Sequence, residues 1–208
     1  MSPSRPNVIV FRAMTGYFPC LCEFEEKLLD EGVNTTVAYP SAHRRIAERL
    51  IAAKNTGNLD GPLVIVGYSL GADNAIRVAR RLGMRGIAVD KLVLLEASKP
   101  SCIPGNVHEC INIYKAQPLN DLMPFFRGCT LTAENPDTVL VNYNVREYND
   151  GRYDWDNHFT LTANPYVQDL MIDEVMSAFE TAPVQEEVVS DEGTDQVSAA
   201  EETPSAVE

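Results

Sequence analysis

The sequence predicts an α/β fold in which a mainly parallel sheet of about six strands carries helices on both faces. Short β-rich segments alternate with amphipathic segments along the chain. Most of the β-rich segments are continuous apolar runs, which is typical of strands buried on both faces of a parallel sheet. Strands that alternate with helices form right-handed crossovers and produce such a sheet. The content of 45% hydrophobic and 23% charged residues is that of a soluble globular protein.

The β-rich segments set the order of the expected strands. They occupy residues 7–13, 34–40, 62–69, 91–97, 110–116 and 138–145. Helices are expected between them, where apolar residues recur at helical spacing: around 21–28, over 43–54 with Ser41 as N-cap, from 70 to 82, and from Asn164-Pro165 to 179. Asn164 followed by proline is a typical helix start.

Charge divides the chain into a folded domain, residues 1–180, and an acidic tail, residues 181–208. The tail holds eight acidic residues and no Lys or Arg, out of a net charge of -13. It has no hydrophobic periodicity, so we expect it to be disordered. The remaining part is only mildly acidic, which argues against nucleic-acid binding. The short connections leave no room for a large cap domain.

Compartment and cofactors are predicted from what the sequence lacks. The first residues contain no apolar core of a secretory signal, and no apolar run approaches the roughly 20 residues that span a bilayer. The five cysteines include no CxxC pair and no zinc-like spacing, which favours reduced thiols. We therefore expect a cytoplasmic protein that does not span a membrane and needs no metal or other cofactor.

The stretch GPLVIVGYSLGADNA, residues 61–75, presents a candidate nucleophile. An apolar run ends in the motif G-x-S-x-G, from Gly67 to Gly71, and a helical pattern follows at once. A strand that turns directly into a helix crowds the positions two before and two after the turn, where glycine removes the clash. Ser69 is then exposed at a helix N-terminus, whose free N–H groups favour developing negative charge.

These residues resemble the nucleophile elbow of the α/β-hydrolase family, and the resemblance extends from residue 7 to about 180. It implies a compact α/β-hydrolase fold and a triad in the order serine, acid, histidine. His158 follows the last expected strand, where the family places its base. His108 precedes the strand at 110–116, which puts it at the opposite edge of the sheet, and His43 opens a helix before the serine.

The acid has two main candidates at carboxyl ends of strands. Glu96 ends LVLLEA, the strand after the elbow, and matches the position that pancreatic-type lipases fill with Asp. Asp121 follows the next strand, closer to the family's commoner arrangement. We prefer Glu96, because a carboxylate that ends a buried run needs a partner. Asp150, Asp154 and Asp156 lie close to His158 in sequence and remain as further alternatives.

An oxyanion hole needs two backbone N–H donors. Leu70, directly after Ser69, is expected to supply one, and Ala13 or Met14 the other. Where the family often carries His-Gly after its first strand, this chain has Arg12-Ala13-Met14. Apolar residues near the site are expected to line a substrate pocket: Tyr17, Phe18, Tyr68, Leu122 and Phe125, the last two in LMPFF at 122–126.

The sequence thus predicts a serine esterase or lipase-like hydrolase that cleaves a small-molecule or lipid-like ester with an apolar acyl group. Ser69 attacks the carbonyl, His158 transfers the proton, and Glu96 or Asp121 orients the histidine. A thioesterase is one alternative. The other is a hydrolase-fold protein that binds a ligand without turning it over.

Overall fold

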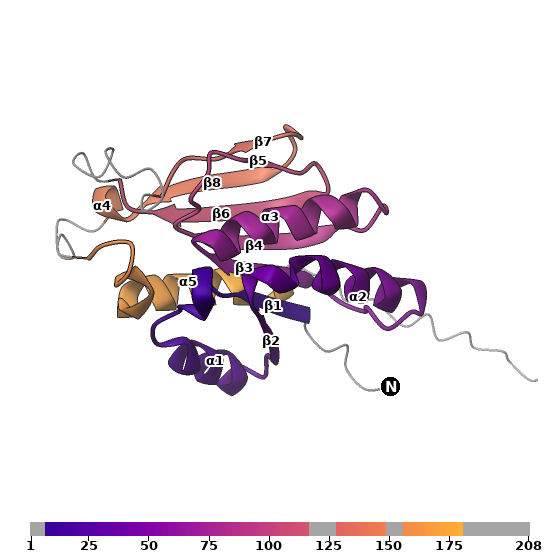
Figure 1. The fold of residues 1–208 in the computed structure, drawn as a ribbon, viewed down its shortest axis with the longest axis horizontal. Helices are drawn as coiled ribbons and strands as arrows, with labels where there is room; N and C mark the ends of the chain where they lie inside the picture. Colours follow the sequence, from indigo (N-terminus) through magenta and orange to yellow (C-terminus); the bar gives the residue numbers. More distant parts are fainter. Residues whose placement is uncertain (1–6, 117–127, 149–155, 181–208) are drawn as a thin grey trace, which may run out of the picture.

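A computed structural model describes residues 7–116, 128–148 and 156–180 of the chain (Figure 1). Its centre is a six-stranded sheet with the order β2-β1-β3-β4-β6-β8, in which every neighbouring pair is parallel. The strands are β1 Asn7–Phe11, β2 Thr35–Ala38, β3 Leu63–Tyr68, β4 Val89–Leu95, β6 Val107–Tyr114 and β8 Val139–Asn144. The α/β class and the parallel sheet expected from the apolar runs are confirmed.

Helices cover both faces of the sheet. They are α1 Leu21–Asp30, α2 His43–Asn55, α3 Leu70–Gly83, the short α4 Val145–Tyr148 and α5 Pro165–Glu180, with 3-10 turns at Met14–Gly16, Pro40–Ala42 and Leu161–Ala163. Figure 1 shows α2 and α3 together in front of the sheet and α5 behind it.

Side chains of the central strands alternate between two apolar cores. In β3, Leu63 and Ile65 pack into the core beneath α2 and α3, whereas Val64 and Val66 pack into the core beneath α1 and α5. Because successive residues of a strand point to opposite faces, an unbroken apolar run is what a doubly covered sheet requires.

Two local features differ from the sequence-based expectation, and a third agrees with it. A second, two-stranded parallel sheet joins β5 (Cys102–Ile103) to β7 (Thr132–Ala133), and strands this short leave no hydrophobic pattern to detect. Helix α2 is preceded by a 3-10 turn, so that Ala42, not Ser41, occupies its N-cap position. Asn164 does cap α5, because its side-chain oxygen accepts from the N–H groups of Tyr166 and Val167 at 3.0 and 3.3 Å.

The expected acidic tail, residues 181–208, lies outside the described residues. In the part of the chain that the structure covers, none of the helices has both the length and the apolar content to cross a bilayer.

Candidate active site

Ser69 occupies a sharp turn between β3 and α3. Its backbone has φ 56° and ψ -121°, a conformation that costs a residue with a side chain of the order of 1–3 kcal/mol. Two glycines make the turn sterically feasible. A Cβ on Gly67 would lie 2.6 Å from the Cα of Ala72, and one on Gly71 would lie 2.4 Å from the carbonyl oxygens of Phe11 and Arg12.

His158 connects Ser69 to Glu96 through its two ring nitrogens. Nε2 lies 2.9 Å from Ser69 Oγ, and Nδ1 lies 3.0 Å from Glu96 Oε2. All three residues are buried, with exposed fractions of 8% for Ser69, 6% for His158 and 1% for Glu96. The serine, acid and histidine proposed from sequence therefore form one continuous hydrogen-bonded chain.

The carboxylate of Glu96 is held from several sides. Oε1 accepts from the N–H of Lys115 at 2.6 Å, and Oε2 accepts from the N–H of Gly128 at 3.0 Å in addition to His158. Gly128 is needed at that place, since a Cβ there would approach Oε1 to 2.7 Å. Glu96 itself has a positive φ of 55°. With these donors the carboxylate has one orientation, which faces the histidine.

Among the other acid candidates, Asp156 is the one that lies in the described part of the chain. The side chain of Asp156 accepts from Thr160 Oγ1 at 2.9 Å and from Asn164 Nδ2 at 2.6 Å. Asp121, Asp150 and Asp154 lie outside the described residues. Asp73, buried on the first turns of α3, accepts from Ser98 Oγ at 2.6 Å, and burial raises the pKa of its carboxyl.

The two candidate oxyanion donors on the loop after β1 are the backbone N–H groups of Ala13 and Met14, and one of them is already hydrogen-bonded. The N–H of Ala13 donates to the carbonyl of Tyr17 at 2.9 Å. A donor that is engaged in the loop's own turn is less available to an oxyanion, so Ala13 stays a prediction that this hydrogen bond does not favour. Met14 is the other candidate on this loop. On the other side, Leu70 is the first residue of α3, where an N–H has no acceptor within the helix.

Two tyrosines hold the loop that carries His158. The hydroxyl of Tyr68 donates to the carbonyl of His158, and the two rings lie 5.5 Å apart. Tyr17 donates to the next carbonyl, that of Phe159, at 2.9 Å. Burial, with the charge of Glu96 as a second cause, raises the pKa of Tyr68, so its hydroxyl keeps its proton as the donor.

The residues expected to line a substrate pocket differ in how far they are exposed. Tyr68 is fully buried and Phe18 is only 8% exposed, because Phe18 packs edge-on against Tyr68 behind the site. Neither presents a wall to a ligand in this structure. Tyr17 remains exposed and stands beside the exposed Phe159, with ring centroids 6.1 Å apart. Leu122 and Phe125 lie outside the described residues.

Sequence reasoning missed the supporting groups of the site. The hydroxyl of Tyr68, the N–H groups of Lys115 and Gly128, and the exposed ring of Phe159 belong to no motif. Only the position of Phe159, directly after the candidate base, was a signal that could have been used.

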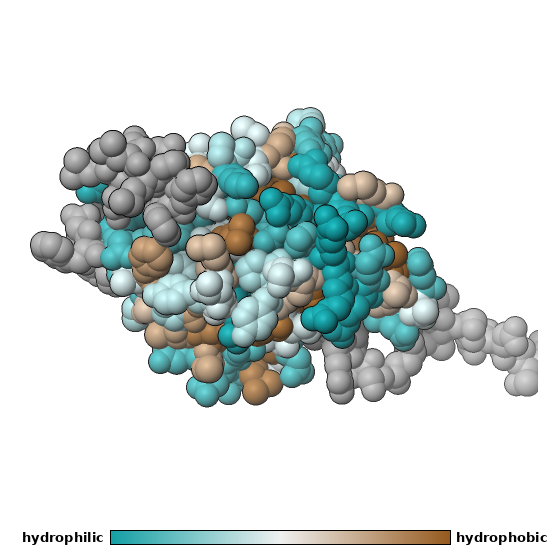
Figure 2. Space-filling model, in the orientation of Figure 1, coloured by the Kyte–Doolittle hydropathy of each residue, from teal (hydrophilic) through white to brown (hydrophobic). Residues whose placement is uncertain are grey.

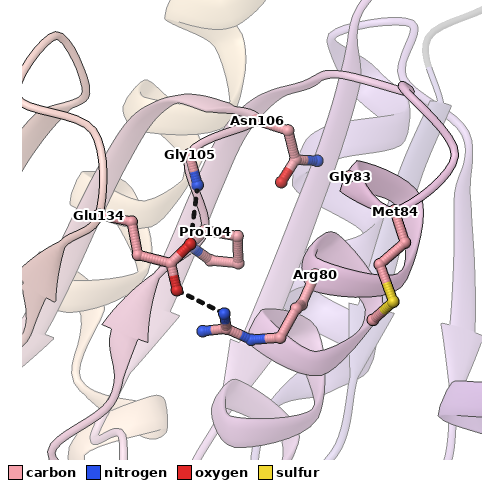
Figure 3. A pocket seen from close by; sticks show the side chains of 7 residues that line it. All are labelled: Arg80, Gly83, Met84, Pro104, Gly105, Asn106 and Glu134. Atoms are coloured by element: carbon pink, nitrogen blue, oxygen red, sulfur yellow. Dashed lines mark hydrogen bonds and ion pairs between the residues drawn. The ribbon is translucent and has the colours of Figure 1, made fainter.

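A separate cavity of about 370 Å³ lies at the far end of α3 (Figure 3). Arg80 and Glu134 form an ion pair across it, and Glu134 also accepts from the N–H of Gly105 at 3.3 Å. Asn106 donates to the carbonyls of Ala79 and Ile87. The polar side chains around this cavity thus already have hydrogen-bond partners within the protein, and α3, at about 1.5 Å per residue, places it roughly 20 Å from Ser69.

In a comparison with protein families, one model matches the amino-terminal part of the chain. Residues 6–108 match the model of the thioesterase domain. The matched segment includes Ser69 and Glu96 and ends before His158. No curated protein matches the sequence.

Comparison with solved structures finds similar chains at low identity. A candidate hydrolase of the α/β superfamily from Xanthomonas campestris has a TM-score of 0.45 and 14% identity, over 83% of this chain and 99% of that one. The RedJ thioesterase of the prodiginine pathway in Streptomyces coelicolor has a TM-score of 0.47 and 13% identity, over 83% and 85%. The type II thioesterase BorB of the borrelidin cluster has a TM-score of 0.46 and 11% identity, over 83% and 94%.

Proposed function

We propose that this chain, which has the α/β-hydrolase fold, is a thioesterase whose nucleophile is Ser69. The observation that carries the proposal is the hydrogen-bonded chain from Ser69 Oγ through His158 to Glu96, at 2.9 and 3.0 Å. A protein that only binds a ligand has no need of a strained serine, a histidine at its hydroxyl and a carboxylate behind the histidine.

The first half-reaction forms an acyl-enzyme. Ser69 Oγ attacks the carbonyl carbon of the thioester while His158 Nε2 accepts the hydroxyl proton. The negative charge that develops on the carbonyl oxygen is bound by the N–H of Leu70, with Met14 as the second donor. Glu96 accepts from His158 Nδ1, fixes the ring and stabilises its positive charge. The tetrahedral intermediate then breaks its C–S bond, and the sulfur leaves with the proton from His158.

The second half-reaction releases the acid. Water attacks the acyl-enzyme carbonyl while His158 accepts its proton. The C–O bond to Ser69 breaks, and Ser69 regains its proton from His158. The products are a carboxylic acid and a thiol, and every proton passes through one nitrogen of one histidine.

The thioester is preferred to an oxygen ester on the basis of the thioesterase domain match. The sequence alone favours an ester with an apolar acyl group, with a thioesterase as the alternative. The triad geometry suits both substrates, whereas the family comparison supports the alternative. A thiol is also more acidic than an alcohol, so sulfur is the easier leaving group and relies less on His158 as an acid.

The nucleophile is tested by intact mass after incubation with a fluorophosphonate. The wild type should gain one phosphonyl group, and Ser69→Ala should gain none. His158→Ala should react far more slowly, because its serine lacks a base. A folded wild-type protein that forms no adduct would contradict the proposed nucleophile and favour the non-catalytic binding protein.

The substrate class is tested with pairs of compounds that share one acyl chain and differ only in sulfur or oxygen at the scissile bond. The expected result is a higher kcat/KM for the thioester at every chain length. If kcat/KM is equal or higher for the oxygen esters while Ser69 still forms the phosphonyl adduct, the protein is an esterase and the thioesterase proposal is wrong.

A further inference from the structure

The two helical layers of this protein carry opposite charge. Six arginines line the outer sides of α2 and α3: Arg44, Arg45, Arg49, Arg77, Arg81 and Arg85, the last just beyond α3. We call this surface the basic face. Helices α1 and α5, on the other side of the sheet, contain eight acidic residues and one lysine. Figure 2 shows strongly hydrophilic residues gathered over α2 and α3.

The arginines of the basic face have no charged partners among the residues that the structure describes. The ion pairs of the described residues involve other cations, namely Lys27, Arg80, Lys91, His108 and His158. Glu48 lies between Arg45 and Arg49 in sequence and forms no ion pair with either. Six uncompensated guanidinium groups on one surface produce a positive potential that attracts anions, although the whole chain has a net charge of -13.

The chain itself contains a segment of matching charge. Residues 181–208 hold eight Asp and Glu and no basic residue. The acidic layer formed by α1 and α5 repels such a segment, and the basic face attracts it. Charge complementarity therefore favours one side of the domain over the other.

The segment also begins at a suitable edge. Lys91, near the start of β4, contacts Glu174 and Ser177 in the last part of α5, so α5 ends at the amino edge of the sheet. Helices α2 and α3 end at the same edge, since each leads into the start of a strand. A chain of 28 residues spans up to roughly 90 Å when extended, which exceeds the thickness of three packed layers several times.

We propose that the acidic segment, residues 181–208, docks on the basic face of its own chain. Covalent attachment gives the segment a local concentration of the order of millimolar, so that weak exposed ion pairs suffice for docking. Such a contact is screened by salt. The docked segment keeps other polyanions from the arginines of α2 and α3, and this conclusion does not depend on the proposed thioesterase activity.

The proposal is tested by NMR on the full-length chain labelled with nitrogen-15. In one variant all eight Asp and Glu of residues 181–208 are replaced by Asn and Gln. In the matched control the eight Ser, Thr and Gln of the same segment are replaced by Ala. At low salt the first variant should shift amide signals of α2 and α3 relative to wild type, and the control should not. The shifts should vanish at about 1 M salt, where the screening length is roughly 3 Å.

A second variant reverses the charge of the other partner. Arg45→Glu, Arg49→Glu and Arg81→Glu together should move the signals of residues 181–208 to the positions that they have in wild type at high salt. These arginines are on the outer sides of their helices, and the dispersion of the amide signals reports directly whether the variant is folded.

Two outcomes would overturn the proposal. Unchanged signals on α2 and α3 after neutralisation of the acidic segment would show that the segment does not dock there. Shifts on α2 and α3 that grow with protein concentration would identify a second copy of the chain as the occupant of the basic face.

Discussion

At the scale of single residues, the proposed chemistry depends on two strained positions. Ser69 and Glu96 both have positive φ, at 56° and 55°, although neither is glycine. The strain of Ser69 presents its hydroxyl to His158, and the strain of Glu96 turns its carboxylate toward the same ring. Residues in such conformations gather at functional sites, where the surrounding structure holds them in place.

Replacing Glu96 by Gln tests its role as partner of the histidine. The amide can donate to Nδ1 and so favour the wrong tautomer, and kcat should fall by about 10⁴-fold, as expected when a triad acid is replaced by its amide. Steady-state kinetics measure the loss. Asp121→Asn, the alternative from sequence, serves as the control and should retain activity. The assignment of Glu96 is wrong if the two variants exchange these results.

Tyr68→Phe removes the hydroxyl that donates to the His158 carbonyl and leaves the buried ring in place. Small displacements of a base are costly, so kcat should fall by about tenfold, with KM unchanged because the ring is buried away from substrate. The rate of fluorophosphonate labelling should fall in parallel. Tyr17→Phe is the control for loss of a loop hydrogen bond at an exposed position. A rise in KM for Tyr68→Phe would contradict a positioning role.

At the scale of the elements, the β3–α3 turn tolerates no added atom on its inner side. In Gly71→Ala the methyl group would meet two carbonyl oxygens of β1 and its following loop at 2.4 Å. The end of β1 and helix α3 must move apart to make room, so the free energy of unfolding should fall by about 1–3 kcal/mol. Urea unfolding measures the change. Gly105→Ala, whose Cβ would meet Asn135 at an ordinary 3.5 Å, should be close to neutral.

The contact between β4 and α5 depends on a buried lysine. Lys91 pairs with Glu174 at 2.6 Å and Glu109 at 3.0 Å. Burial acts to lower its pKa, but the two carboxylates outweigh burial and raise it. A lysine whose folded pKa is raised stabilises the fold at pH values below its unfolded pKa, and this contribution is lost as pH rises through the folded value.

Wild-type stability should therefore decrease above about pH 10.4, the usual lysine pKa, with a contribution from Lys91 that the variant Lys91→Met lacks. Thermal unfolding of both proteins between neutral and alkaline pH measures the difference. Other lysines and tyrosines titrate equally in the two proteins, so the pH dependence should be weaker in Lys91→Met. Parallel curves would show that the ion pairs do not couple protonation to folding.

At the scale of the whole molecule, the sheet joins both apolar cores into one unit. Cys110 lies in β6 within one of these cores, and burial raises the pKa of its thiol. Cys22 is exposed on α1. Iodoacetamide should therefore modify Cys22 in the native protein and Cys110 only after global unfolding. Peptide mass spectrometry over time measures both rates, and similar rates would disprove one cooperative unit.

Much of the fold was predictable because a doubly covered sheet requires unbroken apolar strands. The meeting of Ser69, Glu96 and His158 was predictable for a related reason: each follows the carboxyl end of a strand, and these ends meet at one edge. The hydrogen bond from the N–H of Ala13 to the carbonyl of Tyr17 was not predictable, since it arises from a local turn in which Thr15 has φ 60°. The position of Tyr68 was hidden by its motif, in which the residue before the serine can be of any type.

The central sheet constrains how this protein can change in evolution. Its hydrogen bonding continues past β3 and β4, because Ser69 N–H donates to the carbonyl of Leu95 and Glu96 N–H donates to that of Ile113, both at 2.8 Å. The separation of nucleophile and acid is thus inherited from the fixed strand spacing of about 4.8 Å. Loops around the site can be exchanged or lengthened without altering that separation. Selection for a new acyl group can therefore act on the loops alone, while the reaction is retained.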